Sequence, residues 1–423
     1  MTLNSYSLGI GDRFGQEGRS QLRALQLGAE LGVHVTPVWN KSNREHIIIG
    51  SSPVDTRREA DEAVSAAAWY APYCVDADHI GLATVGRFLE SSDFFTIDVA
   101  DYIGATPDTE AAASYVRAME RFLGDLSIAG IPAPIRVDRS LLDKVARRYL
   151  SAVRAAGEVY RYVERERGAG TFVTEISLDE ADEPQTPAEL LFILAAISLE
   201  RVPVQTIAPK FSGAFLKGVD YVGDVSGFAR EFEEDLAVIA FATKTFDLRG
   251  DLKLSVHSGS DKFSLYPEMH RALRKFNAGL HLKTAGTTWL EELLGLAEAG
   301  GEGLRAARHI YAESLRRYEE LCKPYLSVIS IDQFKLPSVK EVEAWNGLEY
   351  AAALRHNCSD RMYNRDFRQL LHVGYKVAAE MGPRFISLLQ EHRSVIERNV
   401  TENLYRRHLL PLFVGEKHHQ NLR

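Results

Sequence analysis

The chain has 423 residues, and 45% of them are hydrophobic, which is enough to build a large core. The 50 basic and 58 acidic residues give a formal net charge of −8. This acidic balance excludes the general basic character of a nucleic-acid-binding protein. A small acidic substrate remains compatible with it, because lysines and arginines can cluster locally in an acidic protein.

The cysteines and the apolar segments indicate the cellular compartment in which the protein is expected. Cys74, Cys322 and Cys358 are widely spaced and odd in number, so they indicate neither a disulfide framework nor a Cys-x-x-Cys metal site. The first residues lack the basic start and apolar run of a signal peptide. The longest apolar stretch, residues 190–199, is half of the ~20 residues that span a bilayer. We therefore expect a cytoplasmic protein without a membrane partner.

Short apolar and β-branched segments alternate with helical segments over the first 300 residues. We predict strands at residues 6–9, 33–38, 73–76, 94–98, 172–176, 204–208, 252–257 and 280–284. Each is followed by a helix-like segment, the pattern of βα units in a parallel sheet. Eight such units can close on themselves, so the sequence predicts an α/β fold, a TIM-type eight-stranded parallel barrel. An open doubly wound sheet is the structural alternative.

Two regions depart from this alternation. Residues 108–168 separate the fourth and fifth predicted strands, and they indicate an inserted helical pair. Beyond residue 300 the chain is mostly helical. We therefore expect a catalytic barrel domain at residues 1–300 and a helical C-terminal extension, residues 301–423, packed on the barrel. The sequence leaves the oligomeric state open, and a homo-oligomer is compatible with it.

Ionisable side chains follow the predicted strands with unusual regularity. The first five strands lead into Asp12 and Arg13, Asn40 and Lys41, Asp76 with Asp78 and His79, Asp98, and Glu175 with Asp179 beyond it. The last three lead into Lys210, then His257 with Asp261 and Lys262, and finally carry His281, Lys283 and Thr284. The carboxyl ends of barrel strands are where catalytic residues gather. Eight such coincidences therefore indicate an active site.

Each of these features also has an ordinary structural explanation. The spacing in GIGDRFG matches neither the dinucleotide fingerprint nor the Walker A loop, so a tight turn that presents Asp12 and Arg13 is the simpler interpretation. The segment VDADH could cap the next helix. His257 could be a satisfied structural histidine, and His281 could simply be buried. His372, in the helical run RQLLHVGYK, could pack the C-terminal extension.

The functional interpretation rests on convergence. Histidines at the ends of separate barrel strands can meet around one divalent ion and leave positions open for substrate. Neighbouring carboxylates can then act as a general acid and base. Lysines and arginines at the same rim can hold a carboxylate or sugar hydroxyls. Zinc, manganese, nickel and cobalt all remain candidates, because histidine and carboxylate sites accept several ions.

Several strings in the sequence resemble one family. GIGDRFG, DADH, FFTIDVAD, KGVDYVGD, HSGSDKFSLYP, HLKTAGTTWLEE and RQLLHVGYK are similar to segments of the tagaturonate/fructuronate epimerases, whose relatives include 4-epimerases of the neutral ketoses tagatose and fructose. HSGSDKFS and HLKTAGT are the most specific of these strings. The resemblance covers residues 9–376 and implies a β/α-barrel enzyme that uses a bound divalent metal.

The resemblance also implies roles for individual residues. It gives His79, His257 and His281 as metal ligands, with His372 as the alternative third ligand, and Asp78 with Glu175 as the acid/base pair. The residues expected to contact a sugar or sugar-acid substrate are Asp12, Arg13, Lys210, Asp261, Lys262, Lys283 and His372.

The reaction implied is inversion of the fourth carbon of a keto-sugar acid. That carbon is not activated by the ketone, so a retro-aldol cut with re-addition is expected, aided by a metal acting as a Lewis acid. Nicotinamide redox is less favoured, because no dinucleotide fingerprint follows any strand. A lysine Schiff base is a further alternative. A neutral-ketose 4-epimerase, a metal-dependent barrel aldolase or lyase, and a non-catalytic sugar-acid-binding protein are the competing functions.

Overall fold

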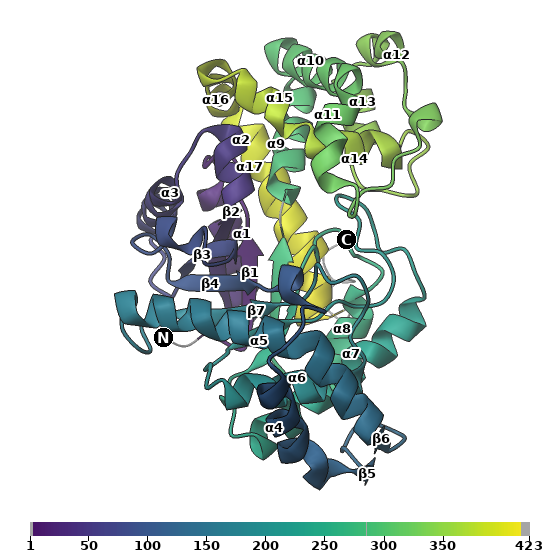
Figure 1. Cartoon of the computed structure of the whole chain (residues 1–423). Helices are drawn as coiled ribbons and strands as arrows, with labels where there is room; N and C mark the ends of the chain where they lie inside the picture. The colour runs from purple at the N-terminus through teal and green to yellow at the C-terminus, as the bar shows by residue number, and fades with distance from the viewer. Residues whose placement is uncertain (1–2, 285, 416–423) are drawn as a thin grey trace.

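Eight parallel strands close into a barrel in the computed structural model, which describes residues 3–284 and 286–415 (Figure 1). The strands are β1 (Tyr6–Ile10), β2 (Val35–Ser42), β3 (Cys74–Ile80), β4 (Phe94–Asp98), β7 (Val173–Ser177), β8 (Thr206–Ala208), β9 (Lys253–Val256) and β10 (Leu280–Thr284). Their order around the ring is β1-β10-β9-β8-β7-β4-β3-β2. The predicted eight-stranded barrel is confirmed, and the doubly wound alternative is excluded because the sheet closes.

Two strands extend four residues further than the sequence predicts, whereas β1 and β7 extend by only one. β2 continues to Ser42 and β3 to Ile80, because residues 40–42 of β2 pair with residues 76–78 of β3. Asn40, Asp76 and Asp78 therefore belong to strands rather than to loops. Residues two apart along a strand face the same side, so these three side chains follow Val38 and Cys74 up the inside of the barrel. Val38 and Cys74, with Phe94 and Val173, form the apolar plug below them.

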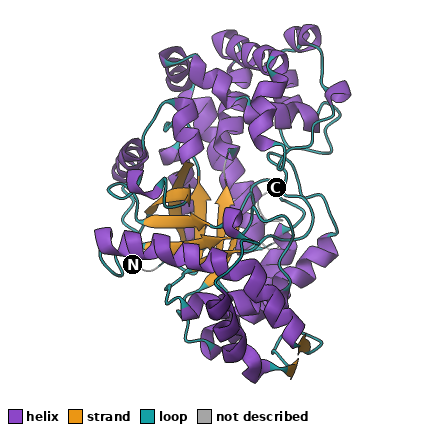
Figure 2. Cartoon of the chain, viewed as in Figure 1, coloured by secondary structure: helices purple, strands orange, loops and turns teal. Residues whose placement is uncertain are grey.

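Helices cover the outside of the ring (Figure 2). Those in the barrel are α1 (Gly18–Glu30), α2 (Asn43–Ile49), α3 (Pro53–Ala66), α6 (Pro187–Leu199), α7 (Val225–Thr245) and α8 (Tyr266–Phe276). The segment after β3 differs from the simple pattern, because it contains only the short 3₁₀ helix η1 (Val85–Arg87). The helices fit the local sequence: α6, for example, begins at a capping box of Thr186 and Glu189 and is apolar on all sides.

The insertion after β4 contains more than the predicted helical pair. After the short 3₁₀ helix η2 (Ala100–Tyr102) come α4 (Thr109–Met119), η3 (Glu120–Phe122), the antiparallel strands β5 (Gly124–Leu126) and β6 (Ile135–Val137), and α5 (Arg139–Arg167). The Asp138 side chain caps α5 by accepting from the amide of Leu141, and the buried face of α5 packs against α6. α5 thus covers the barrel, while β5 and β6 project away from it (Figure 1).

The C-terminal region is helical, as predicted. It comprises α9 (Thr287–Ala299), α10 (Gly301–Arg316), α11 (Tyr318–Cys322), η4 (Lys323–Tyr325), η5 (Gln333–Lys335), α12 (Val339–Ala344), α13 (Gly347–Leu354), α14 (Arg365–Val373), α15 (Tyr375–Glu380), α16 (Pro383–Glu391), α17 (Arg393–Glu402) and the π-helix η6 (Asn403–Val414). Helices α10 to α16 gather at one end of the molecule, opposite β5 and β6 (Figure 1).

The two large apolar cores do not follow the sequence boundary between the barrel and the extension. The core of the extension begins in α9 with Trp289, and Phe14, from the loop after β1, packs against it. Leu409 and Phe413 of η6 belong instead to the barrel core. η6 packs against α1 and α8, so the end of the described chain takes the position of the barrel's eighth helix. The extension is therefore anchored to the barrel at both of its ends: α9 follows β10 directly, and Phe413 of η6 packs on Tyr6 at the start of β1.

None of the helices described is both long and apolar enough to cross a membrane.

Candidate active site

The ammonium group of Lys283 is the centre of a buried polar cluster inside the barrel. Its Nζ lies 2.8 Å from Asp76 Oδ2, 2.7 Å from Asp78 Oδ1 and 3.2 Å from Glu175 Oε1. Thr96 Oγ1 lies 2.5 Å from the same nitrogen. These residues come from β10, β3, β7 and β4 and are all 5% exposed or less. One cation thus holds three carboxylates together where the strands end.

The backbone around Lys283 leaves room for this cluster. Gly9 of β1 is the neighbour of Lys283, and a Cβ on Gly9 would come within 3.1 Å of both Lys283 Cγ and Asn40 Oδ1. Asn40 is buried, and neither of its side-chain atoms has a partner among the described residues. A buried amide without partners is costly. The Asn40 side chain is therefore available to a ligand at this level of the barrel.

Two histidines and an aspartate lie above the cluster. The ring centroids of His79 and His257 are 5.1 Å apart, and His257 Nδ1 lies 3.2 Å from Asp179 Oδ1. Ligand atoms of His79, Asp179 and His257 all lie within 4.8 Å of one another. Two imidazoles and a carboxylate are a common ligand set for divalent transition metals. This group is the candidate metal centre among the described residues, and Asp98 with Glu180 offers a second group around His79.

Each histidine of the centre has a further carboxylate partner. His79 Nδ1 lies 3.1 Å from Asp98 Oδ2, and His257 Nε2 lies 2.8 Å from Glu175 Oε1. Such partners fix the orientation of a ligand imidazole and raise its basicity. Burial acts to lower the pKa of both histidines, but the neighbouring carboxylates outweigh it and raise the pKa of His79 to about 10 and of His257 to about 9.

The carboxyl groups below the histidines have pKa values shifted in opposite directions. Burial raises the pKa of Asp76 to about 7, although Lys283 acts in the opposite direction. Burial also acts to raise the pKa of Asp78, but Lys283 and His79 outweigh it and bring it to about 2. Lys283 and His257 likewise hold the pKa of Glu175 well below its usual range, against the effect of burial. Carboxyl groups with separated pKa values are typical of acid/base sites.

The structure does not bring His281 to the group formed by His79, Asp179 and His257. His281 precedes Lys283 by two residues on β10, so it faces the same interior but lies one layer deeper. Its Nδ1 is 2.9 Å from Ser7 Oγ, and its ring centroid is 5.2 Å from that of Phe94 in the apolar plug. Burial lowers the pKa of His281 to about 3.

Three predicted substrate contacts form one network at the rim. The Asp12 carboxylate accepts from the amides of Phe14, Gly15 and Glu17 and so shapes the loop after β1. The Arg13 guanidinium bonds Glu45 at 3.0 Å, stacks 3.9 Å from the Tyr375 ring centroid and donates to the carbonyl of His372. A Cβ on Gly286, where φ is +84°, would come within 2.4 Å of His372 Nε2. The extension thus touches the barrel mouth through Tyr375 and His372.

The other four predicted substrate contacts have partners within the protein, and those of Lys283 are the three carboxylates described above. Lys210 Nζ donates to the carbonyl of Ala181. Lys262 Nζ donates to the carbonyls of Leu216 and Val219, each at 2.8 Å, and to Ser260 at 3.0 Å. Asp261 lies 3.1 Å from Arg368 Nη2 and 3.4 Å from His356 Nδ1, fully buried. Their roles toward substrate remain predictions.

Sequence reasoning left several residues of the site without a role. Asp179 and Asp98 complete the surroundings of the two histidines, and Thr96 links Asp76 to Glu175 through its hydroxyl. Both aspartates stand at or just beyond strand ends, which is a usable signal. Thr96 carries no signal of its own, because threonine is common in strands. Its contact depends on the register of β4 beside β3 and β7.

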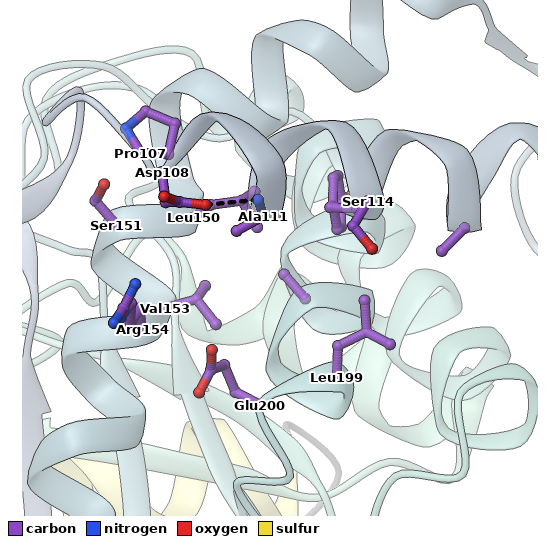
Figure 3. A pocket seen from close by; sticks show the side chains of 13 residues that line it. Pro107, Asp108, Ala111, Ser114, Leu150, Ser151, Val153, Arg154, Leu199 and Glu200 are labelled. Atoms are coloured by element: carbon purple, nitrogen blue, oxygen red, sulfur yellow. Dashed lines mark hydrogen bonds between the residues drawn. The ribbon is translucent and has the colours of Figure 1, made fainter.

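Two cavities lie outside this cluster. One of about 350 Å³ lies between the insertion and α6, where Asp108 bonds the amide of Ala111 and Arg154 and Glu200 lie on the opposite wall (Figure 3). Another of about 650 Å³ lies beside the loop after β1 and is lined by Asp12, Glu17 and Glu59 among others. None of the residues around Lys283 lines the first cavity, so it is separate from the site.

A closed β/α barrel with buried carboxylates, a buried lysine and candidate metal-binding groups at its carboxyl mouth is typical of a barrel enzyme. The model of the tagaturonate epimerase family matches residues 1–411. The chain belongs to the tagaturonate epimerase family. It is therefore an isomerase, of the class of carbohydrate epimerases, and the resemblance found in the sequence is confirmed.

Individual relatives agree with the family match. The tagaturonate/fructuronate epimerase of Thermotoga maritima is 27% identical over 419 residues, which cover 95% of this chain and 79% of the relative. Crystal structures of the fructuronate-tagaturonate epimerase of Cohnella laeviribosi with one and with two glycerol molecules both give a TM-score of 0.80. They are 23% and 24% identical and cover 98% of this chain and 82% and 83% of theirs, so they show a shared fold.

Proposed function

We propose that this protein interconverts tagaturonate and fructuronate by inverting the fourth carbon, counted from the end nearer the ketone, with one divalent metal ion. The observation that carries the proposal is the Lys283 cluster directly beneath the group of His79, Asp179 and His257. The family match and the name of the Thermotoga maritima relative support the choice of substrate.

The donor set fits a divalent ion. His79, Asp179 and His257 offer two nitrogens and one carboxylate oxygen. Three protein ligands leave coordination positions open for substrate oxygens. A divalent ion bound there would act as a Lewis acid on the ketone oxygen and the adjacent hydroxyl. Asp98 beside His79 and Glu175 beside His257 supply the outer carboxylates that metal-binding histidines commonly have.

The proposed route breaks a carbon–carbon bond. The fourth carbon is two bonds from the ketone carbon, so the hydrogen on it is not acidified by the ketone. In the retro-aldol route, the bond between the third and fourth carbons breaks, and its electron pair moves into an enediolate on the first three carbons. The fourth carbon becomes an aldehyde as its hydroxyl loses a proton. The aldehyde turns, the enediolate attacks its other face, and the proton returns to the new alkoxide.

The buried carboxylates suit the two proton transfers. Asp78, ionised beside Lys283, takes the proton of the fourth-carbon hydroxyl as the bond breaks. Glu175 is also ionised, so it first receives this proton through Lys283, whose ammonium group contacts both carboxylates, and returns it on the opposite face after the aldehyde turns. Lys283 holds both carboxylates in place, since its ammonium group contacts each of them. General acid–base catalysis of this kind contributes roughly 10²–10⁴ in rate.

The purified protein tests the proposal directly. Incubation with tagaturonate should produce fructuronate, and the reverse reaction should reach the same equilibrium mixture, as followed by chromatography. Removal of metal by a chelator should stop turnover, and adding back a divalent ion should restore it. Formation of a three-carbon aldehyde acid without its re-addition would identify an aldolase instead. Turnover that is unchanged in a chelator would refute the metal dependence.

A further inference from the structure

Hydrogen bonds from three parts of the protein hold the backbone of the loop between β8 and α7 around Lys217. Lys262 donates to the carbonyls on either side, Leu216 and Val219, at 2.8 Å each. Arg368 Nε donates to the carbonyl of the next residue, Gly218. The amide of Lys217 itself donates to the carbonyl of Val328 in the extension at 2.8 Å. Such pairing fixes the path of the backbone at this residue.

The two cations that hold the loop are themselves fully buried. Arg368 is 0% exposed and Lys262 is 1% exposed. Arg368 is supported by Asp261 at 3.1 Å and by the carbonyl of Leu354 at 2.8 Å. Burying charged side chains is costly unless they are paired. Two buried cations directed at the carbonyls of one short loop indicate that the position of this loop matters to the function.

The loop at Lys217 lies at the barrel mouth, because a Cβ on the next residue, Gly218, would come 3.2 Å from Cδ2 of His372, whose carbonyl accepts from Arg13 at the rim. The charged groups that act most strongly on the ammonium of Lys217 are Arg13, Glu45, Asp78 and Glu180. These residues follow or end four different strands: β1, β2, β3 and β7. Electrostatic interaction with all four agrees with a place for the Lys217 ammonium group at the open end of the barrel. Burial there lowers the pKa of Lys217.

Lys217 differs from the other cations at the mouth. Arg13 pairs with Glu45, Lys41 with Glu59, and Lys283 with three carboxylates. The ammonium groups of Lys210 and Lys262 donate to backbone carbonyls. For Lys217, residues 3–284 and 286–415 supply a hydrogen bond to the backbone amide but no ion pair to the side chain within 4.0 Å. A ligand carboxylate would provide that partner.

We propose that Lys217 binds the carboxylate of the uronate substrate and so selects it over a neutral ketose, and that Lys262 and Arg368 act as positioning residues for its loop. This inference rests on the proposed function. A charge-assisted hydrogen bond to the carboxylate is absent from a neutral ketose, which has a hydroxymethyl group in its place. Its loss should change affinity about ten- to a hundredfold.

The test is Lys217→Met, which keeps the length of the side chain and removes its charge. With tagaturonate, KM should rise about ten- to a hundredfold while kcat changes far less. The inhibition constant of the neutral sugar tagatose should stay that of the wild type. Lys340→Met, which removes an exposed lysine of α12, is the matched control and should change neither constant.

Positioning is tested by Arg368→Lys, which keeps the charge but removes the planar group that reaches Gly218 O. It should also raise the KM of tagaturonate and leave inhibition by tagatose unchanged. An unchanged KM in Lys217→Met, or an equal weakening of tagatose, would overturn the assignment. If the wild type epimerises no uronate, the proposed function fails. In that case, calorimetry measures the binding of tagaturonate and tagatose to the wild type and to Lys217→Met. The role of Lys217 is rejected if these two proteins bind tagaturonate equally.

Discussion

His257 and Glu175 form a direct pair inside the barrel, with Nε2 of the imidazole 2.8 Å from Oε1 of the carboxylate. The other ring nitrogen, Nδ1, lies 3.2 Å from Asp179. His257 therefore belongs to the candidate metal centre and also contacts the cluster of carboxylates around Lys283. This arrangement joins the two halves of the proposed chemistry, and it makes the separate contributions of Glu175 and Asp179 measurable by substitution.

Glu175→Gln should lower kcat by roughly 10²–10⁴, because glutamine keeps the shape of the side chain but cannot exchange a proton. Metal content, measured by mass spectrometry of the purified protein, should stay that of the wild type. Glu59→Gln is the control, since Glu59 is a carboxylate paired with Lys41 outside the barrel interior. If kcat falls by less than tenfold, Glu175 takes no direct part in the proton transfers. A fall that accompanies loss of metal would mean that Glu175 acts through His257.

The metal ligands can be separated by two substitutions. Asp179→Asn should reduce metal content and activity together, because the amide is a weaker ligand than the carboxylate of the group with His79 and His257. His281→Gln should keep its metal, since His281 lies a layer deeper and contacts Ser7. Metal content measured on folded protein distinguishes the two. If His281→Gln is metal-free and Asp179→Asn is not, the ligand set given by the resemblance is the correct one.

The fold was largely predictable from the sequence, because strand and helix periodicity is a local property. The boundaries of β2 and β3 were not, since residues 40–42 become strand only by pairing with residues 76–78. The hairpin β5–β6 was missed because its strands have three residues each. The return of η6 to the barrel core depends on a contact between distant segments, which periodicity does not encode.

The sequence indicated which site residues lie near strand ends, but not how deep in the barrel each side chain lies. His79 and His257 were expected to meet, and their rings lie 5.1 Å apart. His281 has the same residue type and also stands on a barrel strand, yet the register of β10 against β1 puts it opposite Ser7, below the mouth. Depth inside a barrel follows from how the strands are staggered. A single sequence does not reveal that stagger.

The buried Glu292 of α9 predicts a pH dependence of stability. It is 0% exposed, and neither carboxylate oxygen has a partner among the described residues. Burial, reinforced by Asp12 and Glu17 and opposed by Arg13 and Lys41, raises the pKa of Glu292 well above 4.5. The folded state therefore keeps a proton that the unfolded state releases, so this group's contribution to stability is lost as pH rises from about 4.5 through the raised pKa.

Glu292→Gln removes that titration. Relative to the wild type, the variant should gain free energy of unfolding as pH rises from 5 to 8, by up to about 1.4 kcal/mol for each pH unit. Urea denaturation at several pH values measures the difference. Glu319→Gln, at an exposed position of α11, is the control and should show a difference that is flat with pH. A flat difference for Glu292→Gln as well would show that the carboxyl group ionises normally in the folded protein.

The fate of the hydrogen on the fourth carbon tests the mechanism. In the retro-aldol route the bond between that carbon and its hydrogen never breaks, because the carbon passes through an aldehyde. Deuterium placed there should therefore be fully retained in the product, as measured by nuclear magnetic resonance after partial turnover.

Direct proton abstraction would instead exchange this deuterium with water. Redox inversion would retain it but would require a nicotinamide bound to the purified protein, visible by its near-ultraviolet absorption. Either an exchanged label or a bound nicotinamide would exclude the retro-aldol route, whereas a retained label without the nucleotide is the outcome that bond cleavage between the third and fourth carbons requires.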